Sequence, residues 1–436
     1  MCGIFGLVIN NNLKINHSKL ASSIKYLAEK SQTRGKDSSG LSILNQKNNT
    51  LNIYKSPMPI KELINNSKVK NAIEQSFLNN QNDCNYIFGH SRLVTNGSQL
   101  NFENNQPIIK ENLIGVHNGI IVNSDELWEK NNFLKKSLEI DTEVILSIIN
   151  QKILTENYSI SSAVSYALNQ IEGTVSIALL LNNFNKIVLT SNNGSLYKIE
   201  QKNKILFFAS EHFMLHKLAK KINLKKLIGN FKIEQVKPET GYIYDLKDLS
   251  SFYFNTKTQK LNQKEDIINS KLNKIKIFNI NPKNKQLSAV LDLNFIHLST
   301  KATKEKKLLI YDHEEISKLK RCKKCILPET FPFIFYDDSG VCNYCCNYKK
   351  STKLRSIDEL FKVVAPYRKA NGLQDVLVPF SGGRDSTYTL HLAKTELGLN
   401  PVTFTYDWGM VTDLARRNIA RTCGKLGVEN IDRKST

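Results

Sequence analysis

Apolar and polar positions along the first 250 residues alternate between strand-like runs and helical periodicity. The clearest predicted strands are the apolar runs at residues 4–9, 175–181 and 186–190. Helical spacing of apolar positions predicts helices over residues 18–29, 141–151 and 159–170, the last of them capped by Ser159 or Ser161. This order of elements favours an α+β fold in which two helical layers enclose antiparallel sheets, an αββα sandwich.

Beyond residue 250 the pattern changes several times. Residues 251–320 are dense in Asn, Lys and Gln, with charged pieces at 301–307 and 312–324, and are predicted to form a connector. A cysteine-bearing segment follows at residues 321–350. After a predicted helix over residues 356–369, a new α/β pattern begins at Asp375 and continues to the end. The chain of 436 residues is therefore expected to hold several domains.

The formal charge of +21 changes this picture little. Lysines run through the whole chain among many asparagines and isoleucines, and no basic block alternates with aromatic residues. We therefore expect a solvated, lysine-rich surface and no nucleic-acid partner. The chain has neither a run of about eighteen apolar residues nor an amino-terminal signal pattern, which predicts a cytoplasmic protein without a membrane span.

The amino terminus offers the first candidate chemistry. Excision of Met1 would leave Cys2 carrying both a thiol and a free α-amine. An α-amine has a reference pKa of about 8 and can act as the base that activates the thiol. Taken alone, Cys2 fits a small buried cysteine beside a strand equally well.

Four segments in a fixed order accompany Cys2. They are Arg-Gly-Lys-Asp-Ser-Ser-Gly at 34–40, Gly-His-Ser-Arg-Leu-Val-Thr-Asn-Gly at 89–97, His-Asn-Gly-Ile at 117–120 and Asp-Thr-Glu at 141–143. Together they resemble the class II glutamine amidotransferases, which are amino-terminal nucleophile hydrolases. This family includes glucosamine-6-phosphate synthase, amidophosphoribosyltransferase and asparagine synthetase. The resemblance implies a glutaminase domain over residues 2–250.

The resemblance assigns the groups that bind glutamine. A cation is needed for its α-carboxylate and an anion for its α-ammonium. Arg92 and Asp141 stand where the family keeps these two groups, and Thr95 and Asn96 are expected to line the same pocket.

The resemblance also assigns the donors for the tetrahedral oxyanion. They are the Asn118 side chain and the backbone N–H of Gly119. Because an α-amine serves as base, His90 and His117 are predicted to be structural. Residues 34–40 are predicted to be a loop that packs beside the nucleophile.

Five of the eight cysteines lie close together in the sequence. Cys322 and Cys325 form one Cys-x-x-Cys pair and Cys342 and Cys345 another, with sixteen residues between the pairs. This spacing predicts a structural zinc site with four thiolates, and Cys346 leaves the choice of ligands open. A redox pair and an iron–sulfur cluster are the alternatives.

The residues between and beside the cysteine pairs extend the resemblance. Ile-Leu-Pro-Glu-Thr-Phe-Pro-Phe at 326–333, with Asp337, Gly340 and Val341, resembles the N-acetyl sugar amidotransferase family. That family is linked to lipopolysaccharide and surface-sugar biosynthesis. The similarity covers residue 321 to the carboxyl terminus and implies an N-acetylated, nucleotide-linked sugar as acceptor.

A predicted buried parallel strand at 376–380 runs directly into Ser381-Gly382-Gly383-Arg384-Asp385-Ser386. Two glycines and a helix amino terminus suit a pyrophosphate. The segment resembles the PP-loop of ATP pyrophosphatases, which implies ATP with Mg²⁺ on Ser381, Gly382, Gly383, Asp385 and Ser386. Helix capping is the alternative role for Asp385.

A second strand at 402–406 and a helix at 412–426 complete the predicted carboxyl-terminal pattern. Residues 351–436 leave room for only two or three strands of a HUP-like parallel sheet, so we expect an incomplete PP-loop domain. A truncated or split gene, or a second chain that supplies the rest, would account for this.

These features predict an enzyme in which Cys2 releases ammonia from glutamine for an ATP-activated, adenylated acceptor. Asparagine synthase with glutamine as donor is the first alternative. Hexosamine formation is less consistent because it does not use a PP-loop. A glutaminase-only or regulatory protein without a working synthetase half is the alternative from a different class.

Overall fold

The computed structural model describes residues 2–13, 15–78, 84–257, 275–282, 311–349 and 356–434. The chain divides into two compact units. The larger unit contains Met1–Gln286 together with Tyr367–Thr436, and the smaller unit is Leu287–Pro366. We call Tyr367–Thr436 the C-terminal segment.

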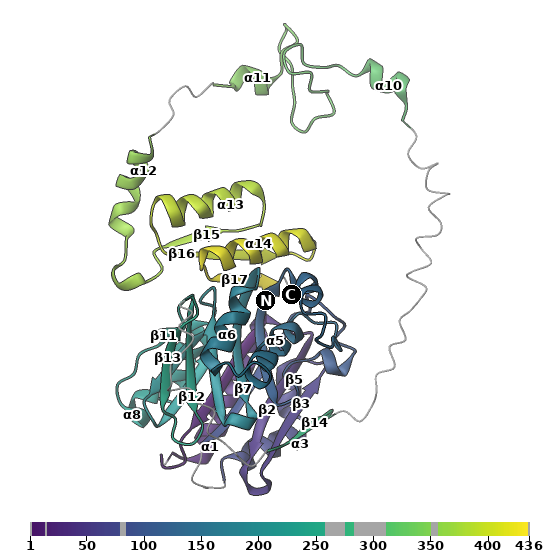
Figure 1. Ribbon diagram of the computed structural model, residues 1–436. Coiled ribbons are helices and arrows are strands. Elements are labelled where there is room, and N and C mark those ends of the chain that lie inside the picture. The colour runs from purple at the N-terminus through teal and green to yellow at the C-terminus, as the bar shows by residue number, and fades with distance from the viewer. Residues whose placement is uncertain are drawn as a thin grey trace. The chain divides into compact units, whose positions relative to one another are not determined.

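Two sheets form the centre of the larger unit (Figure 1). All strand pairs in them are antiparallel except β14 with β3. The eight-stranded sheet contains, in spatial order, β11 (Glu234–Gln235), β9 (Tyr197–Gln201), β10 (Ile205–Ala209), β1 (Gly3–Ile9), β4 (Asn85–Arg92), β2 (Ser38–Asn45), β3 (Thr50–Ser56) and β14 (Lys276–Ile280). The six-stranded sheet contains β13 (Ser251–Asn255), β12 (Thr240–Asp245), β8 (Lys186–Ser191), β7 (Gly173–Leu181), β6 (Leu113–Ile121) and β5 (Ile108–Lys110).

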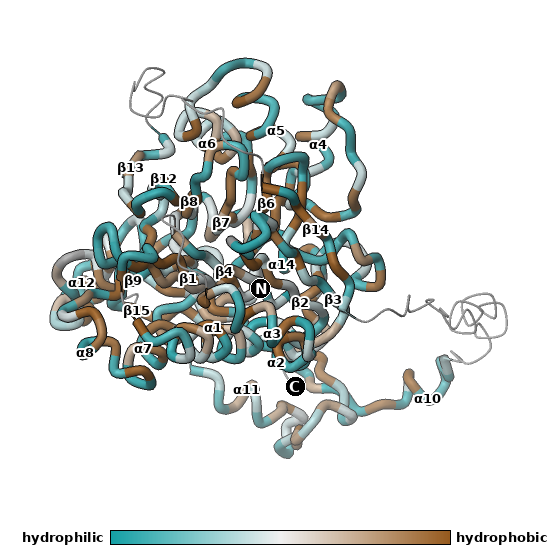
Figure 2. The backbone as a smooth tube through the Cα atoms, turned by 90° about the horizontal axis from the view of Figure 1, so that it is seen from below, coloured by the Kyte–Doolittle hydropathy of each residue, from teal (hydrophilic) through white to brown (hydrophobic). Residues whose placement is uncertain are grey.

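A helical layer covers the outer face of each sheet, as Figure 2 shows from below. The layer on the eight-stranded sheet contains α1 (His17–Ser31), α2 (Ile60–Asn65), α3 (Ser67–Ser76), α7 (His212–Lys221) and α8 (Leu224–Ile228). The layer on the six-stranded sheet contains α4 (Ser124–Lys130), α5 (Thr142–Leu154) and α6 (Ile160–Asn169). The result is the αββα sandwich that the sequence predicts.

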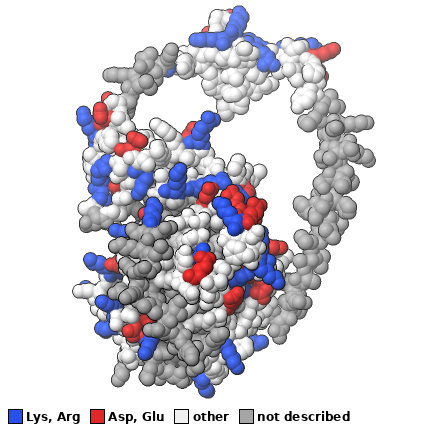
Figure 3. Space-filling view, in the orientation of Figure 1, with Lys and Arg blue, Asp and Glu red and all other residues white. Residues whose placement is uncertain are grey.

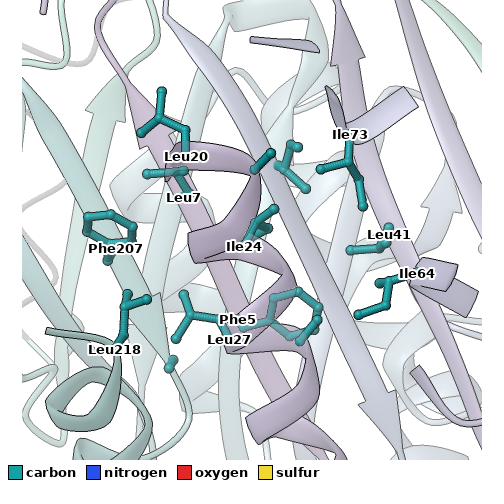
Figure 4. Close-up of a cluster of buried hydrophobic side chains, with 14 of the residues drawn as sticks. Phe5, Leu7, Leu20, Ile24, Leu27, Leu41, Ile64, Ile73, Phe207 and Leu218 are labelled. Atoms are coloured by element: carbon teal, nitrogen blue, oxygen red, sulfur yellow. The ribbon is translucent and has the colours of Figure 1, made fainter. Parts of the chain in front are cut away.

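Three apolar clusters hold these four layers together. The first joins α1 to the eight-stranded sheet, where Leu20, Ile24 and Leu27 of α1 face Phe5 and Leu7 of β1 (Figure 4). The second lies between the six-stranded sheet and its helices. The third fills the space between the two sheets. Burial of these faces provides most of the driving force for the sandwich.

The predicted elements of the sandwich are confirmed to within three residues at each end. The predicted strands correspond to β1, β7 and β8, and the predicted helices to α1, α5 and α6. Ser159 is the residue that caps α6, because its hydroxyl accepts a hydrogen bond from the Ser162 N–H at 3.2 Å. The sheets also continue past residue 250, since β13 and β14 lie in the predicted connector. The charged piece at 301–307 lies outside the described residues.

The C-terminal segment adds a three-stranded parallel sheet to the larger unit. Its strands are β15 (Val376–Pro379), β16 (Pro401–Asp407) and β17 (Asn430–Lys434), and its helices are α13 (Arg384–His391) and α14 (Asp413–Leu426). A π-helical turn, Leu392–Glu396, extends α13. The parallel α/β pattern is confirmed. The prediction that the first strand is buried was wrong, because β15 lies at the sheet edge and Leu377 is 59% exposed.

The smaller unit carries α10 (His313–Lys318), α11 (Asn343–Asn347) and α12 (Ile357–Val364). The predicted helix over 356–369 is shorter than expected, because α12 ends at Val364 and a 3₁₀ turn with Pro366 follows. None of the helices among the described residues is both long and apolar enough to cross a bilayer. Figure 3 shows Lys and Arg side chains scattered over the visible face and mixed with Asp and Glu.

Helix α14 packs directly against β7 of the sandwich. A Cβ atom on Gly424 would lie 1.8 Å from the Gly173 carbonyl oxygen, so the approach requires glycine at this position. At the rim, the Arg421 side chain pairs with Glu172 at 3.4 Å. The C-terminal segment is therefore docked on the sandwich through close backbone packing.

A buried carboxyl group lies in this interface. Glu429 is 5% exposed and accepts hydrogen bonds from the Tyr197 hydroxyl at 2.5 Å and the Gln374 amide at 2.6 Å. Burial raises the pKa of Glu429 to about 7, although these hydrogen bonds and the charge of Arg34 oppose the shift, and Glu211 reinforces it. The folded protein therefore holds a proton on Glu429 at pH values where the unfolded chain has lost it.

We predict that this carboxyl makes stability fall as the pH rises. Because the folded pKa exceeds the ordinary value of 4.5 for a glutamate, the stabilising contribution is complete below about pH 4.5 and is lost through about pH 7. The wild type should lose up to about 3 kcal/mol of its free energy of unfolding over this pH range. Glu429→Gln cannot ionise at this position and should not show that loss. The measurement is the midpoint of thermal unfolding at pH 5 and pH 8. Glu172→Gln, at the exposed rim of the same interface, is the control, and an equal pH response in wild type and Glu429→Gln would contradict the prediction.

Candidate active site and metal centre

Cys2 lies directly before β1 of the eight-stranded sheet. Its side chain is 6% exposed, and the thiol lies 3.5 Å from the Leu93 carbonyl oxygen that follows β4. Burial raises the pKa of the Cys2 thiol, while the nearby charges of Arg92 and Arg34 act in the opposite direction. The thiol is therefore a weak acid that needs an adjacent base in order to react.

The Arg34 side chain holds the backbone of Cys2. Its Nε donates a hydrogen bond to the Cys2 carbonyl oxygen at 2.7 Å, and Arg34 itself is 3% exposed. The adjacent Gly35 lies against the end of β4, where a Cβ would come within 2.3 Å of the Arg92 carbonyl carbon. The prediction of a loop at 34–40 holds only for its first part, since β2 begins at Ser38.

Arg92 ends β4 and organises the turn that follows. Its guanidinium donates to the carbonyl oxygens of Asn96 and Gly97 and to the side chain of Asn105. Thr95 and Asn96 lie in this turn and are half-buried. These contacts fix the guanidinium at the edge of the site.

Asn118 presents an unused amide in the middle of β6. The side chain is 1% exposed, and neither Nδ2 nor Oδ1 has a hydrogen-bond partner among the described residues. A buried amide without partners costs about 1–3 kcal/mol for each group, which a bound ligand would recover. Gly119 follows it, and a Cβ there would lie 1.8 Å from the Thr174 carbonyl oxygen. β6 contacts both β1 and β4, so Asn118 and Gly119 belong to the same region as Cys2.

Two buried histidines make hydrogen bonds inside this region. His90 Nε2 donates to the His117 carbonyl oxygen at 3.0 Å and thereby joins the two sheets. His117 Nδ1 lies 3.1 Å from the Thr142 hydroxyl and 3.9 Å from the Asp141 carboxylate. Burial and the Arg92 charge lower the pKa of His90 to about 3, so this ring is neutral. Both histidines are thus buried and bonded within the sandwich, and their structural role stays a prediction.

Asp141 stands at the amino end of α5 and faces β6. Its Oδ2 accepts a hydrogen bond from the Ile121 N–H at 2.8 Å, which leaves Oδ1 for other partners. Gln106 was not foreseen from the sequence, although it brackets the His117 backbone through Oε1 at 2.6 Å and Nε2 at 3.2 Å. No local sequence signal identifies Gln106, because its role depends on the pairing of the two sheets.

Two stacked sheets between helical layers, with a buried cysteine directly before the first strand, form a fold like that of the amino-terminal nucleophile hydrolases. The comparisons with known proteins agree with this class. Residues 90–217 match the family model described as "Glutamine amidotransferase domain". Residues 90–217 thus resemble a glutamine amidotransferase domain.

Curated relatives align with about half of the chain. The glutamine–fructose-6-phosphate aminotransferase (isomerizing) of Buchnera aphidicola subsp. Acyrthosiphon pisum is 29% identical over 226 residues, which is 51% of this chain and 34% of that protein. The amidophosphoribosyltransferase of Methanocaldococcus jannaschii is 28% identical over 191 residues, which is 42% of this chain and 36% of that protein. The matched region thus spans about a third of each of these relatives.

Among solved structures, the glutamine phosphoribosylpyrophosphate amidotransferase from B. subtilis aligns with a TM-score of 0.42 and 18% identity. The alignment covers 60% of this chain and 50% of that one.

The predicted nucleotide loop lies at the carboxyl end of β15, directly before α13. Gly382 has a φ of +77° and a Cβ there would lie 2.5 Å from the Ala415 carbonyl oxygen, so glycine is required. The hydroxyls of Ser381 and Ser386 lie 3.2 Å apart, and the Gly383 N–H donates to Ser381 at 3.4 Å. Asp385 is exposed in the first turn of α13, whose N-cap is Gly383 without a side-chain cap. The loop therefore presents an exposed helix amino terminus to solvent.

In the smaller unit, the four predicted cysteines form one cluster. The sulfurs of Cys322, Cys325, Cys342 and Cys345 all lie within 4.8 Å of one another. Tetrahedral zinc with Zn–S bonds of about 2.3 Å needs sulfurs roughly 3.8 Å apart, and two of the pairs lie at 3.5 and 3.9 Å. The cluster could therefore hold a zinc ion.

Cys346 lies outside this cluster. Its thiol donates to the Asp337 carboxylate at 3.5 Å. The Cys322 sulfur instead accepts from the backbone N–H groups of Lys324 and Cys342, at 3.4 and 3.3 Å. Such contacts stabilise a thiolate ligand, and they favour the other four cysteines over Cys346 as the ligands.

We predict one zinc ion per chain on these four cysteines. Cys322→Ser should lose the metal, because zinc with three thiolates and a hydroxyl is bound much more weakly. Cys346→Ser is the matched control and should keep it. Metal analysis of the purified proteins measures this. Equal loss in both variants, or iron in place of zinc, would contradict the assignment.

Proposed function

We propose that this protein is a glutamine-dependent amidotransferase. Cys2 hydrolyses glutamine to glutamate and ammonia, and the ammonia reaches an acceptor that ATP has adenylated. The acceptor is an N-acetylated, nucleotide-linked sugar of the kind used in surface polysaccharide synthesis. The observation that carries the proposal is the buried, unpartnered Asn118 amide on β6, in the strand that contacts β1 and its nucleophile.

The residues of the site support a specific order of events. Once Met1 is removed, the Cys2 amine takes the proton of the thiol, and the sulfur attacks the glutamine carboxamide carbon. The oxyanion accepts hydrogen bonds from Asn118 Nδ2 and the Gly119 N–H. Collapse of this intermediate expels ammonia, which takes up the proton, and water then hydrolyses the γ-glutamyl thioester.

Two groups of opposite charge orient glutamine in this proposal. The Arg92 guanidinium binds the α-carboxylate, and the Asp141 carboxylate binds the α-ammonium. The turn contacts that fix Arg92 support this role, as does the second oxygen of Asp141. Thr95 and Asn96 line the pocket between them.

A small cavity supports transfer of ammonia toward the C-terminal segment. It has a volume of about 30 Å³, enough for one small molecule, and Leu93 and Thr95 line it on the sandwich side. Thr405 and Asp407 of β16 line its other side. Asp407 is paired with Arg416 at 2.7 Å, so its charge is balanced.

The nucleotide loop supports ATP as the activating cosubstrate. Its exposed amide groups and the hydroxyls of Ser381 and Ser386 suit a pyrophosphate, and Asp385 suits Mg²⁺ or the nucleotide. ATP would supply the adenylyl group for the acceptor oxygen. In this proposal zinc at the cysteine cluster is structural, because four thiolates leave no open position.

We predict that Cys2→Ala abolishes glutamine hydrolysis, since the variant has no nucleophile. Cys84→Ala, which removes a buried cysteine of the third apolar cluster, is the matched control and should remain active.

Asn118→Ala should lower kcat by about 10²–10³ through loss of an oxyanion donor. Arg92→Lys should raise KM for glutamine about tenfold, because lysine cannot bind a carboxylate with two parallel hydrogen bonds. Glutamate release is the measurement, and an active Cys2→Ala variant would disprove the mechanism.

We further predict that glutamine, ATP, Mg²⁺ and a nucleotide-linked N-acetyl sugar together yield AMP and pyrophosphate. Asp385→Asn should reduce AMP formation. Asp413→Asn, at the equivalent first-turn position of α14, should not. AMP formed only with aspartate would favour an asparagine synthase, and no binding of ATP would favour a glutaminase without a synthetase half.

A further inference from the structure

An ion-pair network joins the nucleophile to the C-terminal segment. Glu211, which precedes α7 and is 4% exposed, accepts hydrogen bonds from Arg34 on one side. On the other side it accepts two from Arg433 of β17, at 2.8 and 2.7 Å. Arg34 in turn donates to the Cys2 carbonyl oxygen at 2.7 Å. Three side chains thus connect β17 to the backbone of residue 2.

The electrostatics of this network favour all three partners together. Although burial alone would raise it, Arg34 and Arg433 lower the pKa of Glu211 to about 2, so the carboxylate is charged at any physiological pH. Two guanidiniums share one carboxylate, and the fork of Arg433 engages both of its oxygens. Without Arg433, the Arg34–Glu211 ion pair would carry no net charge. Its two side chains would, however, be free to rotate toward the space that Arg433 had occupied.

We propose that Arg433 is a positioning residue for glutamine hydrolysis. By fixing Glu211 it orients Arg34, and Arg34 sets where the Cys2 backbone, amine and thiol lie. Docking of β17 is thereby coupled to the reactivity of a cysteine 431 positions away in the sequence. The inference rests on the proposed hydrolysis of glutamine at Cys2, and it means that the glutaminase works at full rate only with the C-terminal segment in place.

The test compares Arg433→Met with Arg421→Met in the full chain. Both changes remove an arginine by which the C-terminal segment pairs with a carboxylate of the sandwich, but Arg421 pairs with Glu172 at the exposed rim. We expect Arg433→Met to lower kcat for glutamine hydrolysis about tenfold, because small displacements of reacting groups are costly. KM for glutamine should change less than about twofold, since Arg92 and Asp141 are untouched. Arg421→Met should match wild type in both constants.

Two further variants keep the test decisive if Arg433→Met folds poorly. Arg433→Lys keeps the charge but reaches one carboxylate oxygen, so its kcat should lie between those of wild type and Arg433→Met at an unchanged thermal midpoint. A double variant, Glu211→Gln with Arg433→Met, should be no slower than Glu211→Gln alone, because both act through the same path.

Wild-type kcat and KM in both Arg433 variants would overturn the inference. An equal loss of kcat in Arg421→Met would also overturn the inference. It would indicate that hydrolysis depends on the interface as a whole and not on this ion-pair network. A wild-type chain that hydrolyses no glutamine would instead disprove the proposed function, so the two failures are distinguishable.

Discussion

The hydrogen bond from His90 to the His117 carbonyl oxygen is the interaction on which the site depends most. It is buried, it joins β4 of one sheet to β6 of the other, and it is 3.0 Å long. Because His90 is neutral, it acts as a plain donor and adds no charge to the interior. Arg92 lies two residues beyond His90 and Asn118 one residue beyond His117, so this bond sets how the two groups face each other. Gln106 also binds the His117 backbone, because its Nε2 donates to the same carbonyl oxygen and its Oε1 accepts a hydrogen bond from the His117 N–H.

The sandwich thus holds polar side chains on rigid strands, and a few of the buried ones have no hydrogen-bond partner among the described residues. Asn118 lacks partners in a chain where most buried polar groups have them. Its cost in stability is acceptable only because the surrounding core is large and well packed. The C-terminal segment adds a second constraint, since it reaches the backbone of Cys2 through Arg433, Glu211 and Arg34. The proposed glutamine chemistry and the docking of the segment therefore depend on the same buried contacts.

Local features of the fold could be predicted from the sequence, and long-range ones could not. Ser159 as a helix cap and the two Cys-x-x-Cys pairs depend on residues a few positions apart. The contacts of Arg34 with Glu211 and of Tyr197 with Glu429 join residues 177 and 232 positions apart, and no periodicity reports such pairings. The same limit explains why β15 was wrongly predicted to be a buried strand. An apolar run predicts a strand, but its place at the edge of a sheet depends on which strands pair with it.

The central claim is that Cys2 is the nucleophile for glutamine. The most direct test is covalent labelling with a diazoketone analogue of glutamine, followed by mass spectrometry of the labelled peptide. The account predicts one label per chain, attached to Cys2 of a chain that has lost Met1, and protection by glutamine. Labelling of another cysteine such as Cys84 or Cys423, or glutamine hydrolysis that survives complete labelling of Cys2, would contradict it.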